Sequence, residues 1–452
     1  MQRIIEPARE IPVLAETDVL VVGGGPGGLA AALASARAGA STLLVERFGC
    51  FGGVITQVGV ETIAWYRQPG TVDVEGIGIE FEQRARAMGG TRAGAHWHSE
   101  TLDAEMFKVV ADTLIRESGV TPLLHCMAVS ALMDGNTIRG IITESKSGRQ
   151  AILAKRVIDA TGDADIAHLA GAPYRRTPAA EMLGVTVIFS CSGVDKPRFM
   201  AYVREHPTKI GDWGRLWAMR TSGKEDEVFS PYLQAPFDRA RADGVIPPEL
   251  TSIGGTWSTI SDSGEATNLN LVYMLGYDST SVQRLTAGEM DGRQQAIYAI
   301  AALRRYVPGF ENARLRNFGM ALGTRDSRKI IGRYNMTEHD VLNQARFDDT
   351  IGIFPEFVDG YGIVVLPTTG RYFQVPYGIL VPQGVENLLV AGRCVAGDKI
   401  SHAALRNMMC CTVTGQGAGV AAAVSVKTGV NAGAVDIRTV QQALIKQGVR
   451  IY

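Results

Sequence analysis

Hydrophobic positions near the start of the chain fall into short runs that end at glycine or at an acidic residue. Val19–Val22 is an apolar run that ends at Gly23, and Ala30–Ala38 is an alanine-rich stretch with helical character. Thr42–Val45 is a second apolar run, and it closes on Glu46. The order predicts a strand, a glycine turn, a helix and a second strand, which is typical of a dinucleotide-binding fold.

The glycines between the first run and the helix have the spacing G-x-G-x-x-G. The first glycine allows a tight turn, the second lets the backbone approach a pyrophosphate, and the third lets the helix pack close to the sheet. Glu46 lies where a carboxylate accepts hydrogen bonds from an adenosine ribose, although the following Arg47 could contact a phosphate. The cofactor contacts predicted here are Gly23, Gly25, Pro26, Gly27, Gly28, Glu46 and Arg47.

Later segments indicate which dinucleotide is bound. The chain reads RFGCFGGVITQ after Glu46, VIDATGD at 157–163, NLLVAGRC at 387–394 and TGQGAGVAAA at 414–423. These segments resemble the FAD-binding superfamily typified by glutathione reductase and succinate dehydrogenase. From about residue 15 to about residue 430 the chain resembles the FAD-dependent oxidoreductase family.

The resemblance implies a set of FAD contacts. The last glycine-rich segment is interpreted as a turn that opens a helix, with the helix N-terminus pointing at the flavin. The contacts implied are Gly52, Gly53, Val54, Ala128, Ala160, Thr161, Gly162, Asp163, Gly392, Arg393, Gly415, Gln416, Gly417 and Gly419.

We therefore expect an α/β protein with two parts. Residues 1–170 and 383–452 are predicted to form a discontinuous Rossmann-like FAD-binding domain, and residues 171–382 a mixed α+β substrate domain. A hairpin is predicted at Asp134–Gly135, and a helix over Thr286–Arg305.

Features that are missing from the sequence narrow the chemistry. Cys50 has no nearby second cysteine, which argues against thiol–disulfide exchange, and there is no second G-x-G-x-x-G for a nicotinamide domain. Aromatic-ring hydroxylases carry Gly-Asp where this chain has Gly392–Arg393. The remaining hypothesis is hydride transfer between flavin N5 and a small, polar or anionic organic substrate, with an unknown electron acceptor or donor. A redox-neutral lyase or hydratase that uses reduced FAD and a non-catalytic electron-transfer subunit stay open as alternatives.

Four residues are candidates for catalysis. His402 and Arg406 are four apart, so on a helix they would share a face as an acid or base and an anion clamp. Arg325, together with Arg328, could line the substrate cavity, and Tyr377 could face the flavin. Each has a structural alternative: flavin support or a subunit contact for His402 and Arg406, a buried ion-pair network between domains for Arg325 and Arg328, and an aromatic wedge in the domain interface for Tyr377.

Composition excludes several other partners. The 452 residues carry a net charge of −1, which gives no reason to expect nucleic acid, and the apolar runs predict no membrane span. Six scattered cysteines and the absence of a signal-peptide pattern lead us to expect a reduced, cytoplasmic protein. His96 and His98 have no further ligands nearby, so no metal site is expected. A homo-oligomer is expected by analogy with related flavoproteins.

Overall fold

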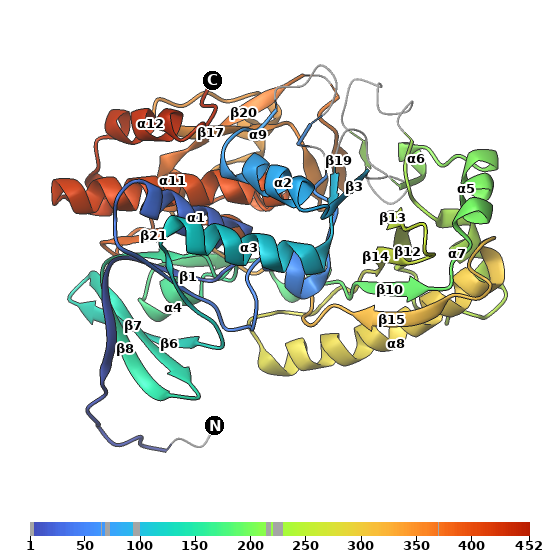
Figure 1. Cartoon of the computed structure of the whole chain (residues 1–452), viewed down its shortest axis with the longest axis horizontal. Coiled ribbons are helices and arrows are strands. Elements are labelled where there is room, and N and C mark those ends of the chain that lie inside the picture. The colour runs from blue at the N-terminus through green and yellow to red at the C-terminus, as the bar shows by residue number, and fades with distance from the viewer. Residues whose placement is uncertain are drawn as a thin grey trace.

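The computed structural model describes residues 4–64, 66–67, 73–93, 100–213, 218–219, 229–368 and 370–452. His96 and His98 lie outside these residues. The first part of the chain is organised around a sheet in which parallel strands meet an antiparallel layer (Figure 1). Its strand order is β5-β2-β1-β8-β7-β6, and β21 also pairs with β8. The strands are β1 (Val13–Val22), β2 (Thr42–Val45), β5 (Thr121–Leu123), β6 (Met127–Asp134), β7 (Thr137–Ser145), β8 (Gly148–Asp159) and β21 (Leu388–Val390).

The parallel strands lie in the middle of the sheet and the antiparallel ones at one side. β1 pairs in parallel with β2 and β8, and β21 pairs in parallel with the last three residues of β8. The first half of β8 pairs with β7 in an antiparallel arrangement, and β7 pairs with β6 across a tight turn. The predicted α/β fold and the predicted hairpin are therefore confirmed. All strands of the parallel part end at the same edge of the sheet, where α1 begins.

Helix α1 (Pro26–Arg37) and helix α11 (Met408–Thr428) lie side by side against the sheet (Figure 1). Their contact needs glycine: a Cβ at Gly415 would lie 2.0 Å from the carbonyl oxygen of Gly27, and one at Gly419 would lie 2.2 Å from that of Ala31. Both pairs are four residues apart, one turn along each helix. The glycines of TGQGAG therefore bring two helices together in the middle of α11, and the predicted turn at this point is wrong.

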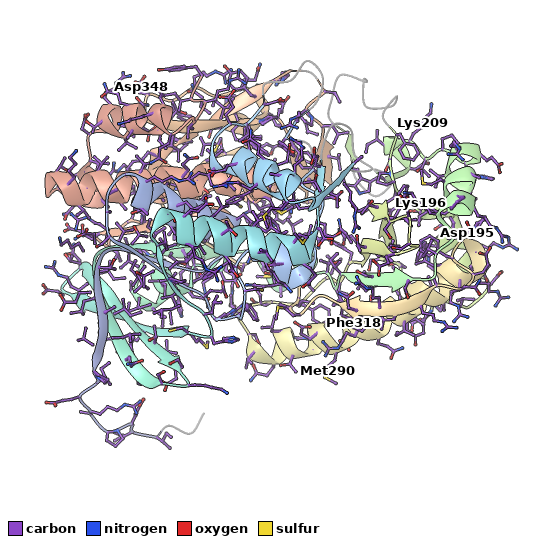
Figure 2. The ribbon with its side chains drawn as sticks, viewed as in Figure 1. Asp195, Lys196, Lys209, Met290, Phe318 and Asp348 are labelled. Atoms are coloured by element: carbon purple, nitrogen blue, oxygen red, sulfur yellow. The ribbon has the colours of Figure 1, made fainter. Side chains whose placement is uncertain are left out.

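The second part of the chain is built on a smaller sheet covered by a long helix. The strand order of this sheet is β12-β14-β10-β15, and β13 also pairs with β14. Helix α8 (Val282–Tyr306) packs against the sheet. It begins a few residues before the helix predicted over Thr286–Arg305. Asp195, which caps α5, and Lys196, which pairs with Asp262, lie at the end of this part far from α11 (Figure 2). The elements are β10 (Phe189–Ser192), β12 (Ile253–Thr256), β13 (Thr259–Ile260), β14 (Ala266–Val272), β15 (Arg314–Phe318), α5 (Lys196–Glu205), α6 (Ile210–Trp213) and α7 (Gln234–Ala242).

Two hydrophobic cores correspond to the two parts, but their boundary differs from the predicted one. The second core runs from Val185 to Leu322. Residues from Ile330 to Val381, which the sequence assigned to the substrate domain, pack into the first core with α1 and α11. They form β16 (Arg328–Ile330), α9 (Glu338–Leu342), β17 (Thr350–Pro355), β18 (Val358–Gly360), β19 (Ile363–Val365) and β20 (Tyr372–Pro376).

The remaining elements complete the first core. Among the described helices, α11 is the one that is long and apolar enough to cross a bilayer, but 94% of its apolar window is buried inside the protein. Its hydrophobicity therefore fits its place as a core helix. The other elements here are α2 (Ile77–Ala87), β3 (Thr91–Ala93), β4 (Glu100–Leu102), α3 (Ala104–Ser118), α4 (Asp165–Leu169), β9 (Tyr174–Arg176), β11 (Ala218–Met219), α10 (Lys399–Leu405) and α12 (Ile437–Lys446).

Candidate active site

A cavity of about 720 Å³ lies between the two parts of the chain. Its walls come from the carboxyl ends of the parallel strands, the start of α1, strand β14 and the loop between β15 and β16. Parallel sheets of this kind bind ligands at this edge. Seventeen of the residues predicted from the sequence line the cavity: Gly23, Gly25, Pro26, Gly27, Glu46, Arg47, Gly53, Val54, Ala128, Ala160, Thr161, Gly162, Asp163, Arg325, Gly392, Arg393 and Arg406.

The start of α1 points its unpaired N–H groups at the cavity. Gly25 is the N-cap, Pro26 occupies the first turn, and no side chain caps the helix or places an acid in its first turn. A Cβ at Gly25 would meet only the Cα of Gly53, at 3.8 Å, so the backbone is open on the cavity side. Free N–H groups and the helix dipole make this a site for an anionic group such as a pyrophosphate.

Gly28 and Gly52 do not line the cavity but shape the turn around it. A Cβ at Gly28 would fall 1.7 Å from the carbonyl oxygen of Gly23, so α1 packs directly on the strand end. The N–H of Gly52 donates to the carbonyl of Gly24 at 2.8 Å, and φ at Gly52 is 111°. Both glycines were predicted to contact the cofactor directly. In the structure they allow close packing of the backbone and do not line the cavity.

Glu46 lines the cavity at the end of β2 and also holds the glycine turn in place. Its Oε2 accepts from the N–H of Gly24 at 2.7 Å, and its Oε1 accepts from the N–H of Phe48 at 2.9 Å. Arg47 is exposed, and its guanidinium lies 4.9 Å from the ring centre of Phe48. The acidic residue therefore fixes two loops at the cavity edge in addition to offering acceptors to a ligand.

The end of β8 forms the opposite side of the same edge. Asp163 accepts from Ser327 at 2.6 Å and pairs with Arg393 at 3.3 Å, which joins this loop to the segment after β21. Behind it, buried Asp159 accepts from the N–H groups of Thr161 and Ala167, and burial raises the pKa of Asp159 to about 6. The loop is thus held rigidly against the cavity.

The N-terminus of α11 also reaches the cavity, but through residues other than those predicted. The helix begins after Asn407, and Asn407, Met408 and Cys411 line the cavity. Gly415, Gly417 and Gly419 are buried along the helix, and Gln416 accepts from the N–H of Ile77 at the start of α2 at 3.0 Å. The four contacts predicted in the TGQGAG segment therefore do not line the cavity, and the helix N-terminus expected there lies seven residues earlier, at Met408.

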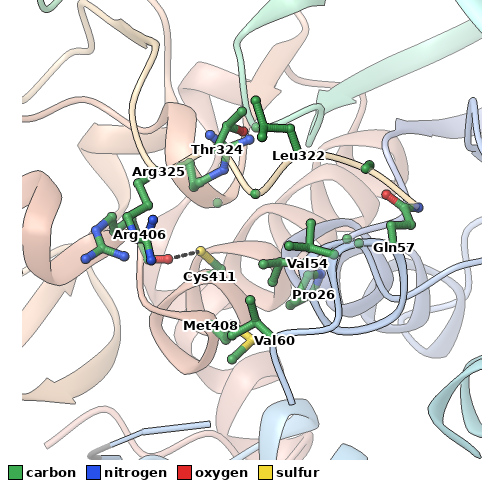
Figure 3. A pocket seen from close by; sticks show the side chains of 18 of the residues that line it. Pro26, Val54, Gln57, Val60, Leu322, Thr324, Arg325, Arg406, Met408 and Cys411 are labelled. Carbon is green, nitrogen blue, oxygen red and sulfur yellow. Dashed lines mark hydrogen bonds between the residues drawn. The ribbon is translucent and has the colours of Figure 1, made fainter. Parts of the chain in front are cut away.

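Two arginines lie together on one wall of the cavity (Figure 3). Arg406 Nη2 pairs with Asp359 Oδ2 at 3.0 Å. Arg325 Nη1 donates to the carbonyl of Gly184 at 2.9 Å, and its guanidinium lies over the ring of Tyr273. Burial, and then the neighbouring Arg406, lower the pKa of Arg325 from its usual value. In the described part of the chain no carboxylate lies within ion-pair distance of Arg325, so this wall carries a surplus positive charge.

His402 lies behind this wall and does not line the cavity. Its ring is buried, and Nε2 contacts the carbonyl oxygen of Arg325 at 2.9 Å. Because a carbonyl only accepts, Nε2 carries the hydrogen. Burial lowers the pKa of His402 to about 3, with Lys329 the next cause. The ring is thus neutral and supports Arg325, so direct proton transfer to a ligand in the cavity does not fit its place.

The comparison with known families decides the class of protein. A model of the family described as FAD dependent oxidoreductase matches residues 18–444. The chain belongs to this family. It is therefore an FAD-dependent enzyme with the Rossmann-type fold expected from its first sixty residues.

Curated and solved relatives of this FAD dependent oxidoreductase are distant. The 6-methylpretetramide 4-monooxygenase of Streptomyces rimosus is 29% identical over 178 residues, which are 36% of this chain and 42% of that protein. The chain thus matches less than half the length of this relative. A geranylgeranyl bacteriochlorophyll reductase-like protein from Thermoplasma acidophilum is 14% identical, with a TM-score of 0.48 over 96% of this chain and 82% of that one. The p-nitrophenol 4-monooxygenase of Pseudomonas putida is 12% identical, with a TM-score of 0.45 over 95% and 84%.

The cavity of this FAD dependent oxidoreductase fits its cofactor in two respects. The backbone is open toward the cavity at Gly25, where the nearest atom to an added Cβ would be the Cα of Gly53 at 3.8 Å, and the uncapped start of α1 suits the pyrophosphate. We infer that Glu46 and Ala128 hold the adenosine end, that Gly25 and Gly392 hold the middle, and that the start of α11 meets the flavin. The last placement matches the preference of a helix N-terminus for negative charge.

Two other predicted residues lie outside the cavity. Tyr377 is buried in the first core, and its hydroxyl donates to the carbonyl of Ala432 at 2.5 Å, so the prediction that it faces the flavin is wrong. Arg328 donates to the carbonyl of Asp163 and pairs with Asp165 at 2.8 Å. It therefore belongs to an ion-pair network, which was the alternative to a place in the substrate cavity. Both roles follow from contacts between segments far apart in sequence.

The residues of this enzyme that β14 and its neighbours bring to the cavity were not predicted from the sequence. Asn268 and Asn270 line it from β14, beside Thr62, Trp257 and Ser258. Within ATNLNLV at 266–272, the stretch NLNL at 268–271 alternates polar and apolar residues, which is the pattern of a strand with one polar face. That alternation was the available signal.

Proposed function

We propose that this FAD-dependent enzyme transfers a hydride between flavin and a small organic substrate that carries an anionic group. One observation supports the anionic group most strongly: Arg325 presents a charged guanidinium on the cavity wall without a carboxylate partner among the described residues. An isolated buried charge is costly, and a bound carboxylate would offset that cost.

FAD, when bound, supplies the group that accepts or donates the hydride. The side chains of the chain then have positioning roles. Arg325 binds the anion, and Arg406 lies beside it with its charge offset by Asp359. His402 holds the main chain of Arg325 from behind, so the clamp keeps its place when the cavity is filled.

The test is anaerobic absorbance spectroscopy of the FAD-loaded protein with a panel of carboxylic acids and the methyl ester of each. We expect one acid class to bleach the flavin at roughly 10- to 100-fold lower concentration than its esters, because a hydrogen bond to a charged group contributes about 1.5–3 kcal/mol. Arg325→Gln should remove this preference. Arg316→Gln, which changes an exposed arginine paired with Glu265, is the matched control. Equal response to acids and esters would contradict the proposal.

A second candidate is oxygen insertion, favoured by the partial similarity to 6-methylpretetramide 4-monooxygenase. Arg393 argues against oxygen insertion, because aromatic-ring hydroxylases carry aspartate at this position. Substrate-dependent oxygen uptake with NADH or NADPH, together with ¹⁸O from O₂ in the product, would favour this candidate. Anaerobic bleaching by the substrate itself would favour direct dehydrogenation.

A further inference from the structure

Strand β14 has an irregularity where it meets the cavity. In the antiparallel pairing of β10 with β14, Phe189 pairs with Leu269 and Cys191 pairs with Ala266. The step between these pairs is two residues on β10 but three on β14, so β14 carries one extra residue, a β-bulge. Within this bulge Asn268 has φ = 50°, in the left-handed region that usually belongs to glycine. Bulges beside active sites commonly redirect a side chain, and here the redirected residue lines the cavity.

The amide of Asn268 joins a cluster of hydroxyl groups from three separate segments. Its Nδ2 donates to Thr62 Oγ1 at 3.0 Å, and that hydroxyl lies 2.6 Å from Ser258 Oγ. Thr101 Oγ1 lies 3.1 Å from Ser258 Oγ on the side away from the cavity lining. We call Thr62, Ser258 and Asn268, which all line the cavity, the hydroxyl–amide cluster.

The hydroxyl–amide cluster is buried and has unused hydrogen-bonding capacity. Thr62, Ser258 and Asn268 are 7%, 4% and 6% exposed, and Asn268 Oδ1 has no hydrogen-bond partner among the described residues. A buried amide oxygen without a partner destabilises the folded chain, so such a group calls for a ligand or another explanation. Hydroxyl groups rotate and can donate or accept, which suits them to an oxygen atom of either kind.

Arg325, which we call the anion clamp, contacts the same strand from the loop between β15 and β16. Two residues beyond Asn268, Asn270 lines the cavity, and its Oδ1 accepts from Thr186 at 2.9 Å and from Arg325 Nη2 at 3.5 Å. The hydroxyl–amide cluster and Arg325 are therefore attached to one strand at neighbouring positions, and a single small molecule can reach both.

We propose that the hydroxyl–amide cluster recognises a hydroxyl or carbonyl oxygen of the substrate. Together with the anion clamp, whose role rests on the proposed function, it selects carboxylic acids that carry a hydroxyl or carbonyl oxygen at the end away from the carboxylate. Trp257 and Phe357 line the same cavity, so a flat ring fits between the two polar groups of such an acid. The cluster itself is a binding site for the oxygen whether or not the other end of the ligand is charged.

The experiment measures binding by the change in flavin absorbance of the FAD-loaded protein. The probes are 4-hydroxyphenylacetate and phenylacetate, and the methyl esters of both. We expect the hydroxylated probe of each pair to bind at least about tenfold more tightly to the wild-type protein, which corresponds to one good hydrogen bond. Thr62→Val, which keeps the shape of the side chain, should reduce this ratio to about one.

Asn268→Gly separates the side chain from its backbone. Glycine accepts the left-handed conformation, so the bulge is kept while the amide is removed, and the ratio should again fall toward one. Thr113→Val is the control, because the hydroxyl of Thr113 bonds only a carbonyl of its own helix. Melting temperature and FAD content show whether each variant is folded.

The outcomes distinguish the two proposals. A wild-type ratio of one within both pairs, or a ratio that Thr62→Val and Asn268→Gly leave unchanged, overturns the role of the hydroxyl–amide cluster. If the wild-type protein shows no preference for acids over esters but still binds the hydroxylated probes more tightly, the result contradicts the anion clamp alone. The same result supports the hydroxyl–amide cluster.

Discussion

The Nε2 atom of His402 donates to the main-chain carbonyl of Arg325 across 77 residues of sequence. This bond makes His402 a positioning residue for the anion clamp. His402→Leu removes the donor and should raise the KM for the substrate by about fivefold, with kcat within about threefold, because one hydrogen bond contributes about 1 kcal/mol. His402→Gln keeps an N–H donor and should restore part of the loss. A variant whose kcat falls a thousandfold with KM unchanged would instead indicate direct proton transfer by the ring.

The low pKa of His402 predicts a pH dependence of stability. Burial lowers this pKa from 6.5 to about 3 in the folded chain. Between these values the unfolded chain binds a proton that the folded chain does not, so stability falls as pH falls through this window and is unaffected above it. His402→Gln should reduce the slope of unfolding free energy against pH by up to about 1.4 kcal/mol per pH unit. Urea unfolding at pH 7.5 and pH 5 measures this difference, and identical slopes in both proteins would contradict it.

Glu46 is predicted to matter for both the cofactor and the glycine turn. Its carboxylate accepts from two backbone N–H groups, at Gly24 and Phe48. Glu46→Gln replaces one acceptor oxygen by a donor and removes the charge, and should weaken FAD binding by roughly tenfold or more. Fluorescence titration of the apoprotein with FAD measures this change. Glu16→Gln, at an exposed position of β1, should leave FAD affinity unchanged.

The glycines of α11 are predicted to stabilise the fold. A Cβ at Gly415 would meet the carbonyl oxygen of Gly27 at 2.0 Å, so Gly415→Ala forces α1 and α11 apart. We expect a loss of about 1–3 kcal/mol in unfolding free energy, measured by urea denaturation. Gly211→Ala is the control because no atom lies within 4 Å of its added Cβ. Equal stability of the two variants would show that the helices tolerate the extra atom.

Tyr377 provides a test of a residue that sequence suggested for catalysis. Its hydroxyl donates to Ala432 inside the first core and lies outside the cavity. Tyr377→Phe should therefore lower stability by about 1 kcal/mol and leave kcat and KM within about twofold. A large loss of kcat at unchanged stability would return Tyr377 to the active site.

The sequence by itself determined the start of the fold and the cofactor. From Val19 to Glu46 every signal is local: an apolar strand, glycines at fixed spacing, a small-residue helix and a second strand. Local backbone requirements of this kind are written in neighbouring residues, so the turn, the start of α1 and the place of Glu46 could all be predicted.

Only the tertiary structure decided which residues meet in the cavity. The glycines of TGQGAG resemble a turn in sequence, but their role follows from contact with Gly27 and Ala31, nearly four hundred residues earlier. His402 and Arg406 share a short helical segment as predicted, yet packing places one behind the wall and the other on it. Asn268 turns toward Thr62 because β14 bulges against β10. Long-range packing sets these positions, and no pattern of neighbouring residues records it.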